Sequence, residues 1–480
     1  MDPGATSVNG GAVAAPVTMR ERARLALIGL GISVVPLDTA VNIAFPDITG
    51  SFGLPIPMIQ WVVICYVLTH AGLMLAFGRV GDMWSHGRVF RAGLLWSIAA
   101  FLLCAAAPSF GWLLFFRFLQ GIGAGLIISC APALVASLYP EARRSHALGI
   151  FTLMFALGSA IGPLIGGALV ARWGWPAVFW FRAPIALTSL LLLRGLPKGG
   201  ERGRAERFDI VGALLLAVGL ASLLLAINAL TRLADGNYLG LAMLATASAS
   251  LVGFVRWEGR AAQPIIQIRL FRSARFALVN LASALMYLMN FSIMLIGPYF
   301  LVRYTGLTLF QAGFALASGF IAMAAASPLA GALVARLGPE WIAPLGALAT
   351  GIGLFSVGSW QPDTPTPLMV LSLALQGMGT GFFQVAYMEI VMSTLPSAHR
   401  GVAGSLSMLT RTIGVVTGAA ALTLGFQAIE MAALASGADK TQAFLAAFHG
   451  LFRIAGVVAA LTGVLVAWPS RPSKPDGRIG

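Results

Sequence analysis

The chain has 480 residues, of which 58% are apolar and only 10% are charged. Soluble domains carry about 25% charged residues, so this chain has too few to cover the surface of a soluble protein. A soluble enzyme and a disordered scaffold are therefore excluded. The three cysteines lie in apolar runs without ligand spacing, which predicts neither a disulfide framework nor a metal site (Cys65, Cys104 and Cys130).

A helix that spans the bilayer needs about 20 predominantly apolar residues. Runs of this kind, separated by charges or by Gly, Pro and Asp, predict fourteen transmembrane helices, at 25–47, 58–77, 90–107, 112–138, 147–171, 177–194, 209–229, 238–257, 276–300, 311–334, 341–359, 368–392, 402–428 and 446–468.

The basic residues explain the net charge of +14. Most of the 31 Lys and Arg residues lie in the two terminal segments and in the loops that follow even-numbered spans. Because basic loops stay in the cytoplasm, both termini are predicted to be cytoplasmic. The positive charge therefore reflects membrane topology and argues against nucleic acid as a partner. The N-terminal residues, with Asp2 ahead of a short Gly/Ala stretch, do not predict a cleaved signal.

An internal repeat divides the spans into two groups. The run LQGIGAG at 119–125 returns as LQGMGTG at 375–381, and at the same offset two glycines of the fifth span return in the thirteenth. We therefore expect two six-helix halves in the same orientation, with the seventh and eighth spans inserted between them. The predicted segments are a cytoplasmic tail (1–24), the first half (25–194), linkers with the inserted helices (195–275), the second half (276–468) and a second cytoplasmic tail (469–480).

Four local motifs accompany this layout. They are LDTAVNIAFP at 37–46, the loop at 78–88, Arg117 followed by QGIG at 120–123, and GSAIGPLIGG at 158–167. With the arrangement of six, two and six spans, they resemble the fourteen-helix drug:proton antiporter branch of the major facilitator superfamily. The resemblance implies an all-α major-facilitator fold in the bacterial cytoplasmic (inner) membrane, and a transporter rather than an enzyme.

Two places depart from the pattern of this branch. The resemblance puts a cytoplasmic gate at Gly78, Asp82 and Arg88, but the residues after Asp82 lack the usual basic run, so the charge network of the gate is thinner. Arg182 stands where the branch usually has Asn. Details of the outer vestibule are therefore not transferred from the family.

Asp38 and Arg117 are the predicted proton-coupling pair. Asp38 lies about 13 residues into the first span, where an ionised carboxylate costs several kcal/mol, so it is expected to exchange a proton as its surroundings dry and wet. Arg117 lies at a similar depth in the fourth span and can reach it. A proton and a cationic substrate can then compete for one carboxylate. The alternative is a purely structural ion pair.

Glu389 is the second carboxylate predicted to lie inside a span, and Arg411 lies at a broadly similar depth in the next span. Neither charge is explained by the repeat. We expect the two side chains to form an ion pair, with Glu389 as a further proton-coupling residue; the alternative is a structural pair.

The fifth span carries small residues at every fourth position with a proline beside them, which predicts a close, kinked helix crossing (Gly158, Gly162, Pro163, Gly166 and Gly167). We expect this seam to lie between the two halves, although plain helix packing explains such spacing too. Polar and aromatic residues within spans are candidates for the substrate cavity: Asn42, Trp61, Tyr66, Gln120, Met154, Phe155, Asn290 and Tyr387.

The expected function is export of amphipathic, cationic or neutral small molecules in exchange for protons, by alternating access. Two alternatives stay open: a dedicated exporter of one endogenous metabolite or antibiotic, and a membrane sensor with the same fold. The expected partners are a small molecule, protons and the lipid bilayer, with no cofactor and no metal, because no ligand pair with metal spacing occurs in a span. The residues neither indicate nor exclude a periplasmic adaptor.

Overall fold

The computed structural model describes residues 27–137, 144–193, 209–230, 238–261, 268–394 and 400–467. All regular structure in these ranges is helical, which confirms the all-α prediction. Nine of these helices are long and apolar enough to cross a membrane, and the bent pair Leu27–Ile43 and Phe45–Ser51 adds a tenth. Shorter apolar helices within the described ranges lie at Ile56–His70, Leu157–Trp173, Ala177–Leu192 and Leu214–Leu223.

The helices follow one another in three groups. After the helical turns that begin at Leu27, the first group is η1 (Pro36–Thr39), α2 (Ala40–Ile43), α3 (Phe45–Ser51), η2 (Ile56–Ile59), α4 (Gln60–Trp84), α5 (His86–Ala105), α6 (Phe110–Ser137), α7 (Arg144–Trp173), α8 (Ala177–Trp180) and α9 (Arg182–Leu192). The second is α10 (Ile210–Leu230) and α11 (Leu239–Glu258). The third is η6 (Ile268–Arg272), α12 (Ala274–Leu295), α13 (Gly297–Arg303), α14 (Leu309–Leu337), α15 (Pro339–Val357), α16 (Thr366–Thr394), α17 (Arg400–Ala435) and α18 (Lys440–Ala467).

The predicted gate loop at 78–88 is mostly helical. α4 continues to Trp84 and α5 begins at His86, so that only Ser85, with φ of 107°, separates them. Gly78 and Asp82 therefore lie on the last turns of α4, and the expected loop is wrong. Arg88 lies on the first turn of α5 and is exposed.

The first and third groups of helices, which are the two halves, pack their repeated glycines in the same way. Gly121 of α6 lies against Tyr66 and Thr69 of α4, and its repeat partner Gly377 of α16 lies against Gly319 of α14. Glycines of α7 likewise pack on the first span, and their repeat partners in α17 pack on α12 (Gly158 and Gly162; Gly414 and Gly418). This is the packing expected when one six-helix unit is present twice, because a glycine allows close approach only where the neighbouring helix is also preserved.

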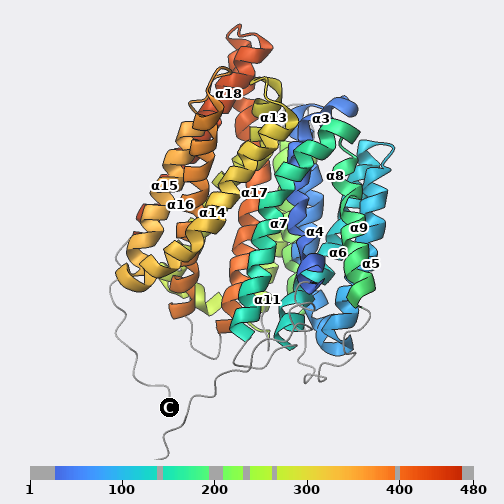
Figure 1. Cartoon of the computed structure of the whole chain (residues 1–480). Helices are drawn as coiled ribbons and strands as arrows, with labels where there is room; N and C mark the ends of the chain where they lie inside the picture. Colours follow the sequence, from blue (N-terminus) through green and yellow to red (C-terminus); the bar gives the residue numbers. More distant parts are fainter. Residues whose placement is uncertain are drawn as a thin grey trace, which may run out of the picture.

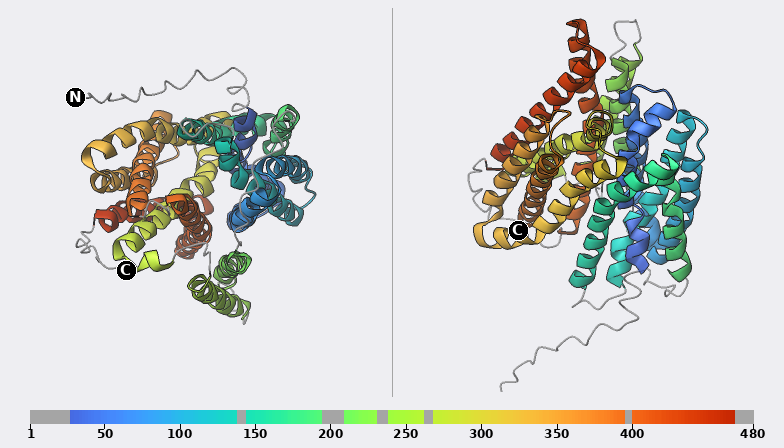
Figure 2. Two further views of the ribbon diagram at one scale, coloured as in Figure 1. Left: turned by 90° about the horizontal axis from the view of Figure 1, so that it is seen from below. Right: turned by 45° about the horizontal axis from the view of Figure 1, so that its top comes forward.

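α10 and α11 form a separate pair at the edge of the molecule (Figure 2, left). Gly219 of α10 packs against Leu251 of α11. Gly72 of α4 approaches Ala217 of α10, which attaches the pair to the first half. α10 also contacts α17, so the inserted pair touches both halves.

The two halves touch at the end of the molecule where α3 and α13 lie (Figure 1, top), and α4 also contacts α17. The Tyr299 hydroxyl of α13 donates to Thr49 Oγ1 at 3.3 Å and to the Phe45 carbonyl at 3.4 Å, and Tyr299 is fully buried. α7 and α14 also cross closely, since a Cβ added at Gly167 would lie 2.3 Å from the Leu309 carbonyl oxygen.

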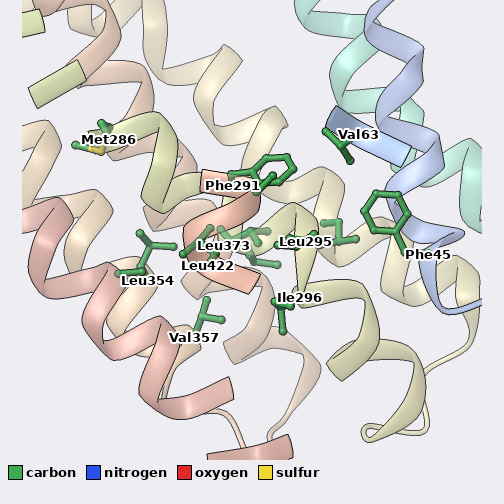
Figure 3. Packing of buried hydrophobic residues seen from close by; sticks show 14 of the residues in the cluster. Phe45, Val63, Met286, Phe291, Leu295, Ile296, Leu354, Val357, Leu373 and Leu422 are labelled. Atoms are coloured by element: carbon green, nitrogen blue, oxygen red, sulfur yellow. The ribbon is translucent and has the colours of Figure 1, made fainter. Parts of the chain in front are cut away.

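One buried apolar cluster extends across both halves. Figure 3 shows Phe45 and Val63 from the first half and Leu295 and Leu373 from the second. The outward faces of the helices also carry large apolar side chains, for example Leu371 at 63% exposed, as a lipid-facing surface requires.

Candidate functional site

Asp38 lies at a break in the first span. Pro36 has no N–H to donate, and the segment Pro36–Thr39 is a short 3-10 helix between α-helical turns. Pro46 lies in the first turn of α3, where the two parts of the span meet at an angle of 60°. At this break the Asp38 carboxylate contacts side chains of α6 and α9, and its side chain is 14% exposed.

Two arginines and one glutamine hold this carboxylate. Arg117 donates from Nη1 to Oδ1 at 2.7 Å and from Nη2 to Oδ2 at 2.9 Å, which is a bidentate ion pair. Arg182 Nη1 also donates to Oδ1 at 2.7 Å, and Gln120 Nε2 donates to the same oxygen at 2.9 Å. The predicted contact between Asp38 and Arg117 is present. We call Asp38, Arg117, Gln120 and Arg182 the charged cluster.

Arg117 is fixed by more than the carboxylate. Its Nε donates to the Val62 carbonyl at 2.8 Å, and Nη1 donates to Gln120 Oε1 at 2.9 Å. The guanidinium lies over the Tyr66 ring, 4.4 Å from its centroid, and the side chain is 1% exposed. Arg117 is therefore anchored to α4 as well as to the first span, so that the ion pair ties three spans together.

Arg182 is the member of the charged cluster that the sequence analysis did not assign to the site. The sequence shows it only as a departure from the family pattern near the beginning of the sixth span, but its side chain is fully buried. Its Nε donates to the Val178 carbonyl at 3.2 Å, and its guanidinium lies 4.5 Å from the centroid of the Phe101 ring. The available signal was an arginine inside an apolar run, at the position that departs from the family pattern.

The charged cluster contains two positive groups and one negative group. Buried ion pairs are favourable only when every charge and every N–H is well compensated. Here Arg182 Nη2 has no hydrogen-bond partner in the described part of the chain. With Asp38 ionised the cluster has a net charge of +1, and with Asp38 protonated it has +2.

The second half has a neutral counterpart. Gln376, the repeat partner of Gln120, donates from Nε2 to Asn290 Oδ1, and to Thr380 Oγ1 at 3.0 Å. Thr380 Oγ1 also donates to Asn290 Oδ1 at 3.2 Å. Leu373, which is buried, stands at the repeat position of Arg117. We call Asn290, Gln376 and Thr380 the neutral cluster.

The glycine motif of α7 packs directly on the segment that carries Asp38. A Cβ added at Gly162 would lie 2.0 Å from Thr39 Oγ1, and one at Gly166 would lie 2.8 Å from the Ala40 carbonyl oxygen. Thr39 Oγ1 also donates to the Ser159 carbonyl at 3.0 Å. The prediction of a seam between the halves is thus right only in part: Gly158, Gly162 and Gly166 face the first span, whereas Pro163 and Gly167 contact α14.

The remaining cavity candidates divide into two sets. Asn42 lies between the halves, where its Nδ2 donates to Met294 Sδ at 3.0 Å. Tyr387 is buried in the second half and donates to Asn280 Oδ1 at 3.0 Å, as a packing residue would. The others are part-buried side chains near the first half: Trp61 packs on the apolar cluster, Met154 lies beside Gly29, and Phe155 faces Arg411.

The predicted ion pair between Glu389 and Arg411 is wrong for this conformation. Both side chains are exposed, and they are not among the ion pairs of the described residues. Glu389 lies about five helical turns along α16 from Leu371, which puts both on the same exposed face. That face is turned away from Gln376, so Glu389 points outward while Arg411 lies between the halves.

Two relatives have similar sequences over most of the chain. Multidrug resistance protein Stp of Mycobacterium tuberculosis is 29% identical over 396 residues, which are 82% of this chain and 74% of that protein. Riboflavin transporter RibZ of Clostridioides difficile is 28% identical over 401 residues, 82% of this chain and 86% of that protein.

Solved structures share the fold at low sequence identity. A bacterial homologue of the human lysosomal transporter Spinster, in an inward-facing and unoccupied conformation, superposes with a TM-score of 0.67 at 16% identity, covering 94% of this chain and 95% of that one. The profile of the Major Facilitator Superfamily matches residues 27–257 and 279–479. With two glycine-matched halves and a polar site at their centre, the chain belongs to the major facilitator superfamily of multi-pass membrane transporters.

Proposed function

We propose that this transporter exports amphipathic small molecules from the cytoplasm in exchange for protons, with fourteen spans and both termini in the cytoplasm. The observation that carries the proposal is the charged cluster. A part-exposed carboxylate held by two buried arginines is a proton site whose loading changes the charge of a dry interior by one unit. The name of the relative Stp, a multidrug resistance protein, supports an export role.

The glycine motif couples this site to the movement of the halves. α7 touches the Asp38 segment through Gly162 and touches α14 of the second half through Gly167. A shift of α14 against α7 is therefore transmitted to the backbone on either side of Asp38. Because protonation weakens the hold of the arginines on the carboxylate, proton binding and the facing of the transporter bias each other.

The contacts between the halves indicate on which side of the membrane this conformation is closed. They include α3 with α13 at one end of the molecule, α7 with α14, and α4 with α17. With cytoplasmic termini, that end faces the outside. The conformation is then closed to the outside at this end.

Proteoliposomes that enclose a fluorescent pH indicator test this function. With an imposed pH gradient, addition of a transported compound should move protons through wild-type protein and not through Asp38→Asn. The compounds should be a panel with matched rings and negative, zero or positive charge. If no compound moves protons, and Asp38→Asn behaves as wild type, proton-coupled transport is refuted.

A dedicated transporter of one compound is the second candidate, because the relative RibZ is named for a single compound, riboflavin. A panel in which one compound alone moves protons would favour this alternative. Compounds that bind without any gradient-dependent movement would favour a sensor.

A further inference from the structure

Arg411 of α17 is a positive charge between the two halves, without an acidic partner among the described residues. Its guanidinium lies 6.0 Å from the centroid of the Phe155 ring of the first half and 5.9 Å from that of Tyr287 in the second. The side chain is exposed, and no carboxylate of the described residues lies within 4.0 Å of it. The guanidinium therefore lies at the boundary between the two halves, where a transported molecule has to pass.

The depth of Arg411 in the bundle makes its charge unusual. Phe155 lies in the middle third of α7 and Tyr287 near the middle of α12, so the guanidinium lies well inside the apolar part of the bundle. An ionised arginine at this depth is tolerated only where it meets water, a counter-charge or a ligand. An exposed arginine that contacts rings of both halves thus faces the transport path and not lipid.

The charges around this path are mostly positive. The buried charged cluster adds two guanidinium groups and one carboxylate, and Arg182 Nη2 has no hydrogen-bond partner. His70 and Tyr66 of α4 are the titratable groups within electrostatic range of both Arg411 and Asp38. Glu389, the acid once expected to balance Arg411, lies on the outward face of α16. Two arginines therefore share the carboxylate of the charged cluster, and Arg411 adds a third positive charge.

We propose that the transported molecule carries a negative charge on an aromatic body, and that Arg411 binds that charge. A sulfonate, carboxylate or phenolate would accept from the guanidinium, while the rings of Phe155 and Tyr287 would pack on the aromatic part. A cation would instead meet Arg411 and the positive cluster, and would compete for a carboxylate that two arginines already occupy. This inference names the substrate class of the proposed function, but binding can be measured without transport.

Binding of matched dyes tests the charge preference. The probes are 8-anilino-1-naphthalenesulfonate, N-phenyl-1-naphthylamine, which has the same rings without the sulfonate, and the cation ethidium. Purified full-length protein in lipid nanodiscs is titrated with each dye, and empty nanodiscs measure partition into lipid. Wild type should bind the sulfonate most tightly. Binding of ethidium more tightly than the sulfonate overturns the proposal and needs no variant to interpret.

The variant Arg411→Gln assigns the preference to this residue. It should weaken binding of the sulfonate about tenfold, as loss of a hydrogen bond to a charged group predicts, and leave the uncharged dye unchanged. Arg411→Lys should retain part of the affinity, and it also serves if the Gln variant does not fold. Arg172→Gln is the matched control, because Arg172 is also exposed beside an aromatic ring, at 5.5 Å from Trp173, but lies at the far end of α7.

Two results separate this inference from the proposed function. Charge-selective binding that depends on Arg411, without gradient-driven flux of any dye, supports the inference and refutes proton-coupled transport. Gradient-driven flux of all three dyes with no effect of Arg411→Gln on the sulfonate supports transport and overturns the inference. Equal loss of the sulfonate and of the uncharged dye in Arg411→Gln also overturns it, because the residue would then only shape the site.

Discussion

The charged and neutral clusters occupy related places in the two halves. Each is built on a glutamine of the same repeated motif, Gln120 in α6 and Gln376 in α16, that donates to a residue of the first span of its half. In the first half that residue is Asp38, joined by two arginines; in the second half it is Asn290, joined by a threonine.

The difference shows how one scaffold can carry two roles. The neutral cluster satisfies its polar groups with hydrogen bonds alone, so its energy changes little with pH or with the charge of a ligand. In the charged cluster one carboxylate holds two arginines, so gain of one proton by that carboxylate weakens both ion pairs. We therefore expect the charged cluster of the first half to respond to protons. The neutral cluster of the second half should change little when the pH changes.

The largest effect should come from Asp38→Asn. It leaves two buried guanidinium groups without a counter-charge, which we expect to cost about 3–5 kcal/mol and to abolish gradient-driven transport. Asn290→Ala, the corresponding change in the neutral cluster, should cost only about 1–3 kcal/mol. Thermal unfolding in detergent and proton movement in proteoliposomes measure the two effects. Equal losses of stability would contradict the contrast between the clusters.

The two arginines should differ in what their loss does. Arg117→Gln removes a bidentate pair and the bonds to Val62 and Gln120, so we expect a loss of about 2–4 kcal/mol. Arg182→Gln leaves a charge-balanced Asp38–Arg117 pair and removes the buried group without a partner, so its cost should be below about 1 kcal/mol. The double variant Asp38→Asn/Arg182→Gln should recover stability relative to Asp38→Asn, but not transport. An Arg182 variant less stable than the Arg117 variant would disprove this order.

The glycine seams give a smaller contrast of the same kind. A Cβ at Gly162 would lie 2.0 Å from Thr39 Oγ1, whereas one at the repeat partner Gly418 would lie 3.0 Å from the Leu288 carbonyl oxygen. Gly162→Ala should therefore cost about 1–3 kcal/mol and slow transport, and Gly418→Ala should cost less. Transport rates of the two variants, compared at equal amounts of folded protein, check this. If Gly418→Ala slows transport more than Gly162→Ala does, the contact of Gly162 with the Asp38 segment is not the tighter of the two.

The smallest effect is expected at Glu389. Because its side chain is exposed and has no ion-pair partner among the described residues, Glu389→Gln should change stability by less than about 0.5 kcal/mol and leave proton movement at the wild-type rate. Loss of proton coupling in this variant would show that Glu389 takes part in proton transfer. The structure would then need a second conformation in which α16 turns this face inward.

Several features could be predicted because they are written along the chain. The length of apolar runs indicates spanning helices, the 256-residue spacing of the glutamine–glycine motif indicates the duplication, and the depth of Asp38 and Arg117 in their spans indicates that they can meet. Each of these depends on position along one helix, which the rise per residue converts into depth.

Direction around a helix was harder to predict. Glu389 and Arg411 have similar depths, but Glu389 shares a face with Leu371 and points outward, so equal depth did not bring the two together. Arg182 lies in the predicted sixth span, 177–194, and in the structure it begins α9 directly after the short helix α8. Which way it points is set by the junction of these two helices, which turns its side chain towards the break at Pro36–Thr39.

The sequence by itself determined the membrane class, the helical architecture, the repeat and the pairing of Asp38 with Arg117, because apolar length and residue spacing are properties of the chain alone. Only the tertiary structure decided that Arg182 joins this pair, that Arg411 stands between the halves with no acid beside it among the described residues, and that the α7 glycines contact two different partners. These facts depend on how helices rotate and bend to satisfy buried charges and close packing together, and no single span contains that information.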